Sequence, residues 1–216
     1  MTLQTNIPVH EVVYRKLRDL ILFGEIAPGQ AVTIQGLVER LDAGMTPVRE
    51  AIRRLTSEGA LNFQGNRRII VPVLSDKNMT ELYFLRQTLE PRLIFLAAER
   101  AGKEDIARLT RIDSDLDRAI KTGDINQYLR KNYKFHSELY RLADAPILEA
   151  VADSLWLRYG PSLRVVCGRV GTLGLTDQHK ETLAAMTTGN PQKAGEAILA
   201  DVTQGIDQIK SSIMGK

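Results

Sequence analysis

The most restrictive feature of this sequence is a very short connection between two amphipathic segments. From Ile34 to Leu41 the apolar residues recur at i, i+3, i+4 and i+7, and the same spacing recurs from Val48 to Leu55. The segment between them, residues 42–45, contains Gly44 and is too short for anything but a tight turn. We therefore expect two helices that share one core across a tight turn.

Capping residues predict where the helices of this region begin and end. An earlier amphipathic helix over residues 10–23 is expected to end at Gly24. Thr33 is expected to cap the second helix. Thr46 is expected to cap the third, with Pro47 at the first helical position, where its missing N–H costs nothing.

Residues 61–71 predict a β-hairpin. Apolar and polar residues alternate on both sides of a turn at 64–66, which places Arg67 and Arg68 at its tip. Helix, helix, tight turn, helix and hairpin is the order of a winged helix-turn-helix. In such a domain the third helix fits the DNA major groove, and a basic wing reaches phosphates or the minor groove.

The distribution of charge agrees with binding to DNA. The net charge is only +3, but residues 40–71 hold six arginines against three carboxylates. Arg49 and Arg53 share one flank of the outward face of the third helix, and arginine suits contacts with phosphates and base edges. The alternative is a small helical domain whose arginine-rich helix merely faces solvent.

Other features exclude several classes of protein. Cys167 is the only cysteine, so neither an intramolecular disulfide nor a CxxC metal site can form. Residues 1–12 lack the apolar core of a signal peptide, and no apolar run is long enough to span a membrane. We expect a cytoplasmic protein with no membrane partner.

The remaining two-thirds of the chain shows only helical periodicity. Ser75 is expected to cap the first helix, which divides the chain into a DNA-binding domain over residues 1–75 and a helical domain over 76–216. The expected fold is mainly α, with a C-terminal antiparallel all-α bundle of about six helices. Their ranges are 76–100, 104–121, 124–142, 146–166, 177–188 and 191–210.

Polar side chains fall on the apolar stripes of four of these helices. They are Arg86, Glu90, Asn132, His136, His179 and Asp201. Buried polar groups are costly unless they satisfy one another or bind something. Arg86 and Glu90, one turn apart, could simply pair with each other, and a single inward histidine is common in cores. Because four helices contribute, we favour a polar ligand cavity within the bundle.

The N-terminal residues resemble a known family. The run from Thr46 to Leu55, TPVREAIRRL, is similar to the recognition-helix signature of the GntR family of bacterial repressors, and the resemblance extends over residues 10–73. It implies that Arg49 reads bases. It also implies that Thr46, Arg53 and Arg40 contact phosphates or flanking bases, and that the wing touches the minor groove.

Two positions depart from that family's pattern. Gly44-Met45 stands where Ser-Arg is usual, so one base-reading arginine is missing and the operator has room to differ. Arg68 stands where a glycine is usual, and its charge should strengthen contact with phosphates.

The C-terminal region resembles the FCD-type effector domain, which makes the chain similar to the FadR subfamily. The matching pieces, within residues 80–205, are LRQTLE at 85–90, NYKFH at 132–136, APIL at 145–148 and QH at 178–179. In many such domains one Asp and three His bind a divalent metal, which a small carboxylate effector chelates. We therefore assign Arg86 and Glu90 to effector binding, with Arg86 holding the carboxylate.

The resemblance also implies a set of metal ligands: Asn132, His136, His179 and Asp201. Asn132 stands where Asp is usual, and Asp201 stands where the third His is usual. Two imidazoles and one carboxylate suit Zn²⁺, Ni²⁺, Mn²⁺ or Fe²⁺. An amide oxygen is a poor replacement for a carboxylate, so weaker metal binding, or none, follows.

The sequence thus predicts a homodimeric, ligand-responsive repressor that binds a palindromic operator and is not an enzyme. One alternative is an enzyme with a mononuclear metal held by His136, His179 and Asp201. Neither an HExxH pair nor a nucleophile–base arrangement supports it. The other alternative is an architectural DNA-binding protein whose helical domain only dimerises.

Overall fold

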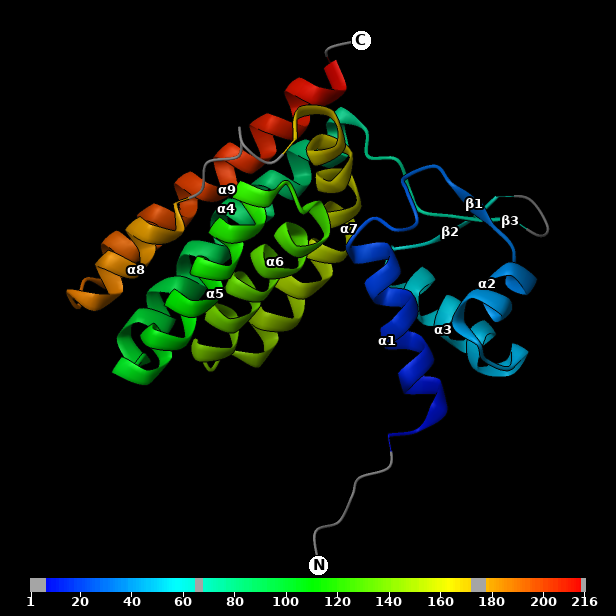
Figure 1. Ribbon diagram of the computed structural model, residues 1–216, viewed down its shortest axis with the longest axis horizontal. Coiled ribbons are helices and arrows are strands. Elements are labelled where there is room, and N and C mark those ends of the chain that lie inside the picture. The colour runs from blue at the N-terminus through cyan, green and yellow to red at the C-terminus, as the bar shows by residue number, and fades with distance from the viewer. Residues whose placement is uncertain (1–6, 65–67, 172–177, 215–216) are drawn as a thin grey trace, which may run out of the picture.

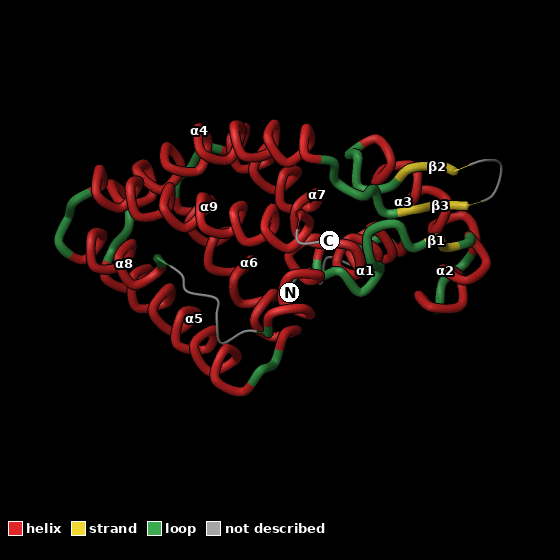
Figure 2. The backbone as a smooth tube through the Cα atoms, turned by 90° about the horizontal axis from the view of Figure 1, so that it is seen from above, coloured by secondary structure: helices red, strands yellow, loops and turns green. Residues whose placement is uncertain are grey.

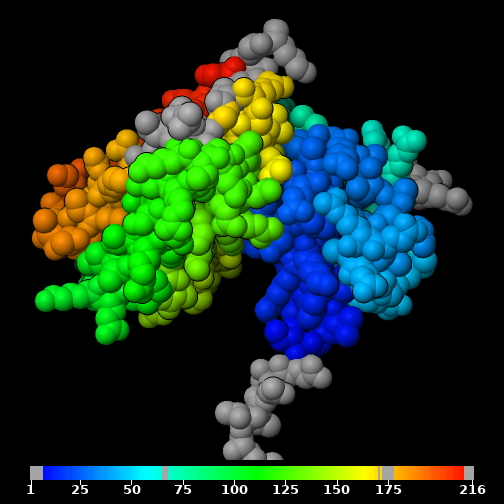
Figure 3. Space-filling model, viewed as in Figure 1, coloured from blue at the N-terminus to red at the C-terminus, as the bar shows by residue number. Residues whose placement is uncertain are grey.

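The computed structural model describes residues 7–64, 68–171 and 178–214. These residues form a small N-terminal lobe of helices and one sheet, and a larger lobe made only of helices (Figure 1). A hollow separates the first helix from the helical bundle on the face shown in Figure 3. The expected mainly α fold, with a winged helix-turn-helix followed by a six-helix bundle, is confirmed within the described residues.

The N-terminal lobe is a winged helix-turn-helix. Its elements are α1 (Val9–Leu22), β1 (Ala31–Val32), α2 (Ile34–Leu41), α3 (Met45–Ser57), β2 (Asn62–Gln64) and β3 (Arg68–Ile70). The strands form an antiparallel sheet in the order β1-β3-β2, in which Ile69 pairs with Val32 on one side and with Phe63 on the other. The hairpin was expected, whereas β1 is too short to leave an alternating pattern in the sequence. The hairpin turn and Arg67 lie outside the described residues.

The helix ends of this lobe follow the capping rules, with one correction. Thr33 caps α2, and its hydroxyl accepts a hydrogen bond from the amide of Gly36 at 3.1 Å. Thr46 does not cap α3, because the helix begins at Met45 with Gly44 in the capping position. The first four amides of a helix have no partner within it. Pro47 is therefore tolerated at any position of the first turn, and it does not fix the cap.

The C-terminal lobe is a bundle of long helices. They are α4 (Asp76–Arg100), α5 (Lys103–Thr122), α6 (Ile125–Leu142), α7 (Pro146–Val170), α8 (His179–Thr187) and α9 (Pro191–Met214). A capping box of Ser75 and Asn78 starts α4 as expected. Helices α4 and α9 run side by side along one edge (Figure 2). A Cβ on Gly195 would lie only 3.0 Å from the backbone oxygen of Pro91, so this glycine permits their close approach.

The apolar interior is continuous between the two lobes, and α7 packs against helices of both. The fully buried Leu17 and Ile21 of α1 and Leu55 of α3 belong to the core of the N-terminal lobe. Helix α1 also packs against α7, the bundle helix nearest the N-terminal lobe. In the part of the chain that the structure describes, no helix is both long and apolar enough to cross a membrane.

Candidate functional site

The outward face of α3 presents a row of polar side chains. The buried stripe of Val48, Ile52 and Leu55 turns the opposite face to solvent. Arg49 and Arg53 are exposed there, one turn apart, and within residues 7–64, 68–171 and 178–214 neither pairs with a carboxylate. Both guanidinium groups are therefore available for phosphates or base edges.

Other residues expected at the DNA are placed less uniformly. Thr46 is exposed in the first turn of α3, and Arg68 is exposed at the start of β3. Arg40 lies 3.5 Å from the carboxylate of Glu25. The neighbouring Arg54 is bound within the protein, because it pairs with Glu58 at 3.1 Å. The adjacent Arg53 and Arg54 thus differ, because Arg53 is exposed to solvent and Arg54 forms ion pairs within the protein.

Inside the bundle, the polar residues predicted to face inward meet around a small cavity of about 20 Å³. Its lining comes from α4, α6, α7 and α9 and includes Arg86, Tyr128, Asn132, His136, Trp156, Tyr159 and Asp201. With the adjacent Glu90 and His179, these residues form the polar cluster. A space of this size holds about one water molecule or one ion. The structure thus brings four of the six predicted residues to the lining, and the other two, Glu90 and His179, contact His136 and Asp201.

His136 lies between two carboxylates at the centre of this cluster. Its Nδ1 is 3.3 Å from Oε2 of Glu90, and its Nε2 is 3.2 Å from Oδ2 of Asp201. The ring is fully buried. Burial favours the neutral imidazole, but the contacts with Asp201 and Glu90 outweigh it and raise the pKa of His136 to about 9. Without a metal, both ring nitrogens of His136 are therefore protonated at neutral pH, and the imidazole is positively charged.

His179, at the first turn of α8, repeats this arrangement. Its Nδ1 is 3.4 Å from Oδ1 of Asp113, and its Nε2 is 3.9 Å from Oδ1 of Asp201. The ring is fully buried and stacks on Phe135, with 3.9 Å between the ring centroids. Each histidine thus has one carboxylate at Nδ1 and directs Nε2 toward Asp201.

This donor set fits a divalent metal. One ligand atom from each of His136, His179 and Asp201 lies within 4.8 Å of the other two. Ligand atoms bound to one Zn²⁺ are about 3.3 Å apart, so small side-chain shifts would close the set. Nε2 of His136 is buried and makes no hydrogen bond within the described residues. A carboxylate at the far nitrogen of each histidine is the usual outer shell of metal-bound imidazoles.

Asp201 is held ready as an anionic ligand. Burial alone would raise its pKa, but the close contact with His136, the neighbouring His179 and the backbone amide of Gln178 hold the pKa well below its usual range. That amide donates to Oδ1 at 3.1 Å. Asn132 is buried and lines the same cavity, so its amide oxygen is the remaining candidate ligand.

Arg86 and Glu90 form a buried ion pair next to the histidines. Nε of Arg86 donates to Glu90, whose other oxygen accepts a hydrogen bond from Tyr140 at 2.6 Å. Burial opposes ionisation of Glu90, but Arg86 and His136 more than offset it and lower the pKa to about 2. The pairing that the sequence left open is therefore present.

One nitrogen of Arg86 is left over by this pairing. Its Nη1 is buried and makes no hydrogen bond within the described residues. The guanidinium carbon lies 4.8 Å from the ring centroid of Trp156 and 4.3 Å from that of Tyr159. A buried donor beside two aromatic rings suits one oxygen of a carboxylate.

Sequence reasoning missed several members of the site. Asp113 lies on the buried stripe of α5 with Leu109 and Leu116, and this pattern could have identified it. Tyr140 follows the stripe of His136 in the same way. Trp156 is buried in the core, and it also lines the cavity.

Comparison with known proteins identifies both lobes. The profile of the bacterial regulatory proteins of the gntR family matches residues 10–71, and the FCD domain profile matches residues 81–204. The chain is a member of the GntR family. As a GntR regulator with an FCD domain, it is a DNA-binding transcription regulator.

Relatives over most of the chain carry the same description. The HTH-type transcriptional regulator McbR of Escherichia coli is 28% identical over 89% of this chain and 88% of its own. The Nta operon transcriptional regulator of Aminobacter aminovorans is 28% identical over 87% of this chain and 88% of its own. The E. coli transcriptional repressor RspR is 25% identical over 99% of this GntR member and 94% of its own chain.

A solved structure agrees with the fold. The structure of E. coli McbR/YncC superposes with a TM-score of 0.90, at 26% sequence identity, over 96% of this chain and 99% of that chain. The whole chain therefore has the fold of a GntR regulator with an FCD domain.

Proposed function

We propose that this protein is a homodimeric repressor that binds a palindromic operator and responds to a small carboxylate in the C-terminal bundle. The observation that carries the proposal is the convergence of His136, His179 and Asp201 beside the buried Arg86. The exposed Arg49 and Arg53 of α3 are the groups that would read and grip the operator. Arg40, Thr46, Arg67 and Arg68 would contact the flanking backbone.

The bundle site would hold one divalent metal, Zn²⁺, Ni²⁺, Mn²⁺ or Fe²⁺, through His136, His179 and Asp201, with Asn132 as a weak fourth ligand. When bound, the metal would supply an open position for an oxygen of the effector. Arg86 would hold the carboxylate through Nη1, and Glu90 would fix both Arg86 and His136. Hydroxy- and keto-acids match this combination of charge and chelation.

Regulation requires that the effector prefer one arrangement of the two lobes. An effector that releases the operator must bind the DNA-free arrangement more tightly than the DNA-bound one. Its binding energy can shift the equilibrium only by that difference. RspR is named a repressor, which favours repression over activation for the present protein as well.

The test is metal content by elemental analysis after dialysis without chelator, for the wild type and His136→Ala. We expect about one metal per chain in the wild type and a loss in the variant. The metal-loaded protein would then be titrated with small hydroxy- and keto-acids while its affinity for a selected operator duplex is followed. If neither the wild type nor the variant contained metal, the proposal would lose its metal, and Arg86 alone would anchor the effector.

The same titrations separate the regulator from its two alternatives. Turnover of the acids by the purified protein would favour a mononuclear-metal enzyme. Unchanged DNA affinity with every acid, despite binding of metal, would favour a DNA-binding protein without an effector.

A further inference from the structure

Two helices of the N-terminal lobe end in the same local structure, and both ends face α7. Phe23 is the C-terminal capping residue of α1 and is followed by Gly24. Glu58 is the C-terminal capping residue of α3 and is followed by Gly59. Both glycines have positive φ, +65° and +74°. This is the usual left-handed end of a helix, in which following amides bond to some carbonyls of the last turn. The carbonyl of the capping residue has no partner within the helix and can accept a hydrogen bond.

An arginine of α7 occupies each of these helix ends. Nε and Nη2 of Arg158 donate to the backbone oxygen of Glu58 at 3.3 and 3.1 Å. Nη1 of Arg164 donates to the backbone oxygen of Phe23 at 3.5 Å. A cationic donor at a helix C-terminus is favourable because the carbonyl dipoles point toward it.

The glycines also provide the space for these arginines. A Cβ on Gly59 would lie 2.6 Å from Nη2 of Arg158, and a Cβ on Gly24 would lie 2.6 Å from Cβ of Arg164. Each glycine thus serves both the backbone conformation and the approach of the arginine. We call these two contacts the arginine sockets: Arg158 on Glu58-Gly59 and Arg164 on Phe23-Gly24.

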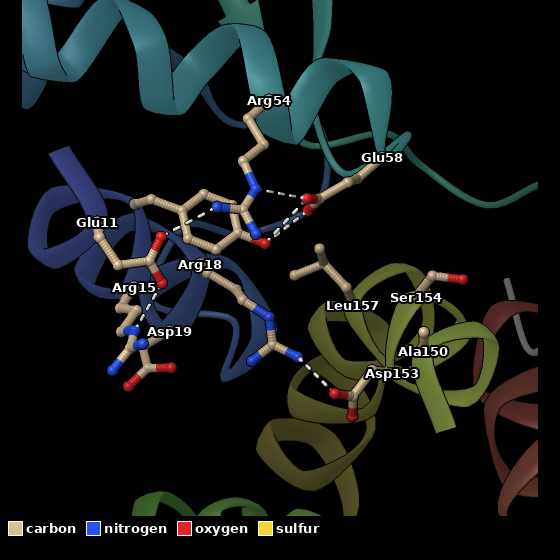
Figure 4. Close-up of a pocket in the computed structure, with 11 residues that line it drawn as sticks. Glu11, Arg15, Arg18, Asp19, Arg54, Glu58, Ala150, Asp153, Ser154 and Leu157 are labelled. Carbon is tan, nitrogen blue, oxygen red and sulfur yellow. Dashed lines mark hydrogen bonds and ion pairs between the residues drawn. The ribbon is translucent and has the colours of Figure 1, made fainter. Parts of the chain in front are cut away.

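Elsewhere between α1, α3 and α7 the lobes are separated by a cleft of about 570 Å³, which Figure 4 shows in close-up. Arg18 reaches across it to Asp153, but their closest atoms are 3.9 Å apart. The Arg164 socket lies outside this cleft, whereas Glu58 of the Arg158 socket is one of its lining residues. Helix α3 makes few direct contacts with α7 and is held to it mainly through α1, which packs against both helices.

Helix α7 also forms one wall of the polar cavity. Two residues before Arg158, the buried Trp156 donates from Nε1 to the hydroxyl of Tyr140 at 2.9 Å. One residue after it, the buried Tyr159 packs on the guanidinium of Arg86. Within four residues of α7, Trp156 and Tyr159 therefore contact the cavity, while Arg158 contacts the end of α3.

We propose that Arg158 and Arg164 are positioning residues that set the orientation of the DNA-binding lobe, and that Arg158 acts on α3 directly. A second part of the inference rests on the proposed function. When the cavity is occupied, Trp156 and Tyr159 shift, and the Arg158 socket transmits this shift to α3. Neither arginine lines the cavity.

The experiment compares Arg158→Ala with Arg158→Lys and with Arg141→Ala. Arg141 is an exposed arginine of α6 that pairs with Glu138, away from the N-terminal lobe. Spin labels on cysteines introduced at the exposed Gln35 and Lys121 report the distance between the lobes. Native Cys167 is fully buried, and burial raises the pKa of its thiol to about 12, so it can stay. Mixing with excess unlabelled chain isolates distances within one protomer.

For Arg158→Ala we expect a broader distance distribution and about two- to fivefold weaker binding to a duplex selected by the wild type. Arg158→Lys keeps a cationic donor and should restore much of both, and Arg141→Ala should match the wild type. Wild-type distances and affinity in Arg158→Ala would overturn the proposal. Should that variant not fold, Arg164→Ala is judged by the same two measurements, with Arg141→Ala as control. Broader or shifted distances support the proposal, and unchanged ones overturn it.

A second set of measurements tests the coupling with Zn²⁺ alone as the probe. Trp156 is the only tryptophan, so its fluorescence reports the cavity. In the wild type both the fluorescence and the label distance should change, whereas in Arg158→Ala only the fluorescence should. Equal distance changes in both proteins would overturn the coupling. No fluorescence change in the wild type would instead refute the metal site, while the first set still decides the positioning role.

Discussion

Glu90 Oε2 lies 3.3 Å from Nδ1 of His136, on the side of the ring opposite the Asp201 carboxylate. This contact keeps a proton on Nδ1 and leaves Nε2 as the nitrogen that a metal can bind. It also makes the imidazole more basic. The metal therefore competes with a proton at Nε2.

The first prediction concerns the pH dependence of metal affinity. Because the pKa of His136 is raised to about 9, we expect the apparent affinity for Zn²⁺ to increase about tenfold per pH unit from pH 7 and to level off near pH 9. Titrations in a metal buffer across this range measure it. Glu90→Gln should lower the pKa of His136, so the plateau should begin at a lower pH and lie about 10- to 100-fold lower in affinity. A flat profile in the wild type would contradict protonation of His136.

The second prediction concerns the operator. Arg49→Ala should weaken operator binding by about 1–3 kcal/mol and relax the preference at one base position. Arg53→Ala, on the same flank, should weaken all sequences alike and reduce the salt dependence by about one phosphate contact. Binding to a library of duplex variants at several salt concentrations distinguishes these effects. Wild-type affinity in Arg49→Ala would show that another residue reads the bases.

A third prediction uses two glycines of α7. A Cβ on Gly160 would lie 2.3 Å from the backbone oxygen of Leu22, whereas a Cβ on Gly168 would meet nothing within 4 Å. Gly160→Ala should push α1 away from α7 and destabilise the protein by about 1–3 kcal/mol. Gly168→Ala should be neutral or stabilise α7 by up to about 1 kcal/mol, since alanine favours helix. Denaturant unfolding of both variants would measure the difference, and equal stabilities would argue against direct contact between α1 and α7.

The fourth prediction addresses the buried ion pair. Arg86→Met should destabilise the metal-free protein by about 3–5 kcal/mol, because the buried Glu90 carboxylate loses its ion-pair partner. Adding Glu90→Leu should restore most of that stability, as replacement of a whole buried pair often does. Neither protein should bind a carboxylate effector at this site. If the double variant still bound one, the effector would have a different anchor.

The helices and the site residues were predictable to different degrees. Long amphipathic helices such as α6 and α9 leave a clear 3.6-residue period, and polar residues that interrupt it, such as His136 and Asp201, are visible as exceptions. The two-residue strand β1 leaves no period. The sequence predicts the start of α3 two residues too late, because Thr46 and Pro47 are acceptable at several positions of a first turn.

Relationships between helices were the harder part. The stripe of α5 contains Asp113, but only the structure places it at His179. Nothing in the sequence around Arg158 indicates that its guanidinium binds the end of α3, since the two segments are 100 residues apart. Local patterns report which face of a helix is buried, whereas the partner across that face depends on the packing of the whole chain.

The cavity of about 20 Å³ has a consequence for the speed of the response. It is too small for a carboxylate, so the proposed effector could enter only after side chains that line the cavity move aside. Association that depends on such an opening is slower than diffusion allows and reaches a ceiling as the effector concentration rises. A cell using this regulator would average over brief fluctuations of the metabolite and react only to changes that outlast the opening time.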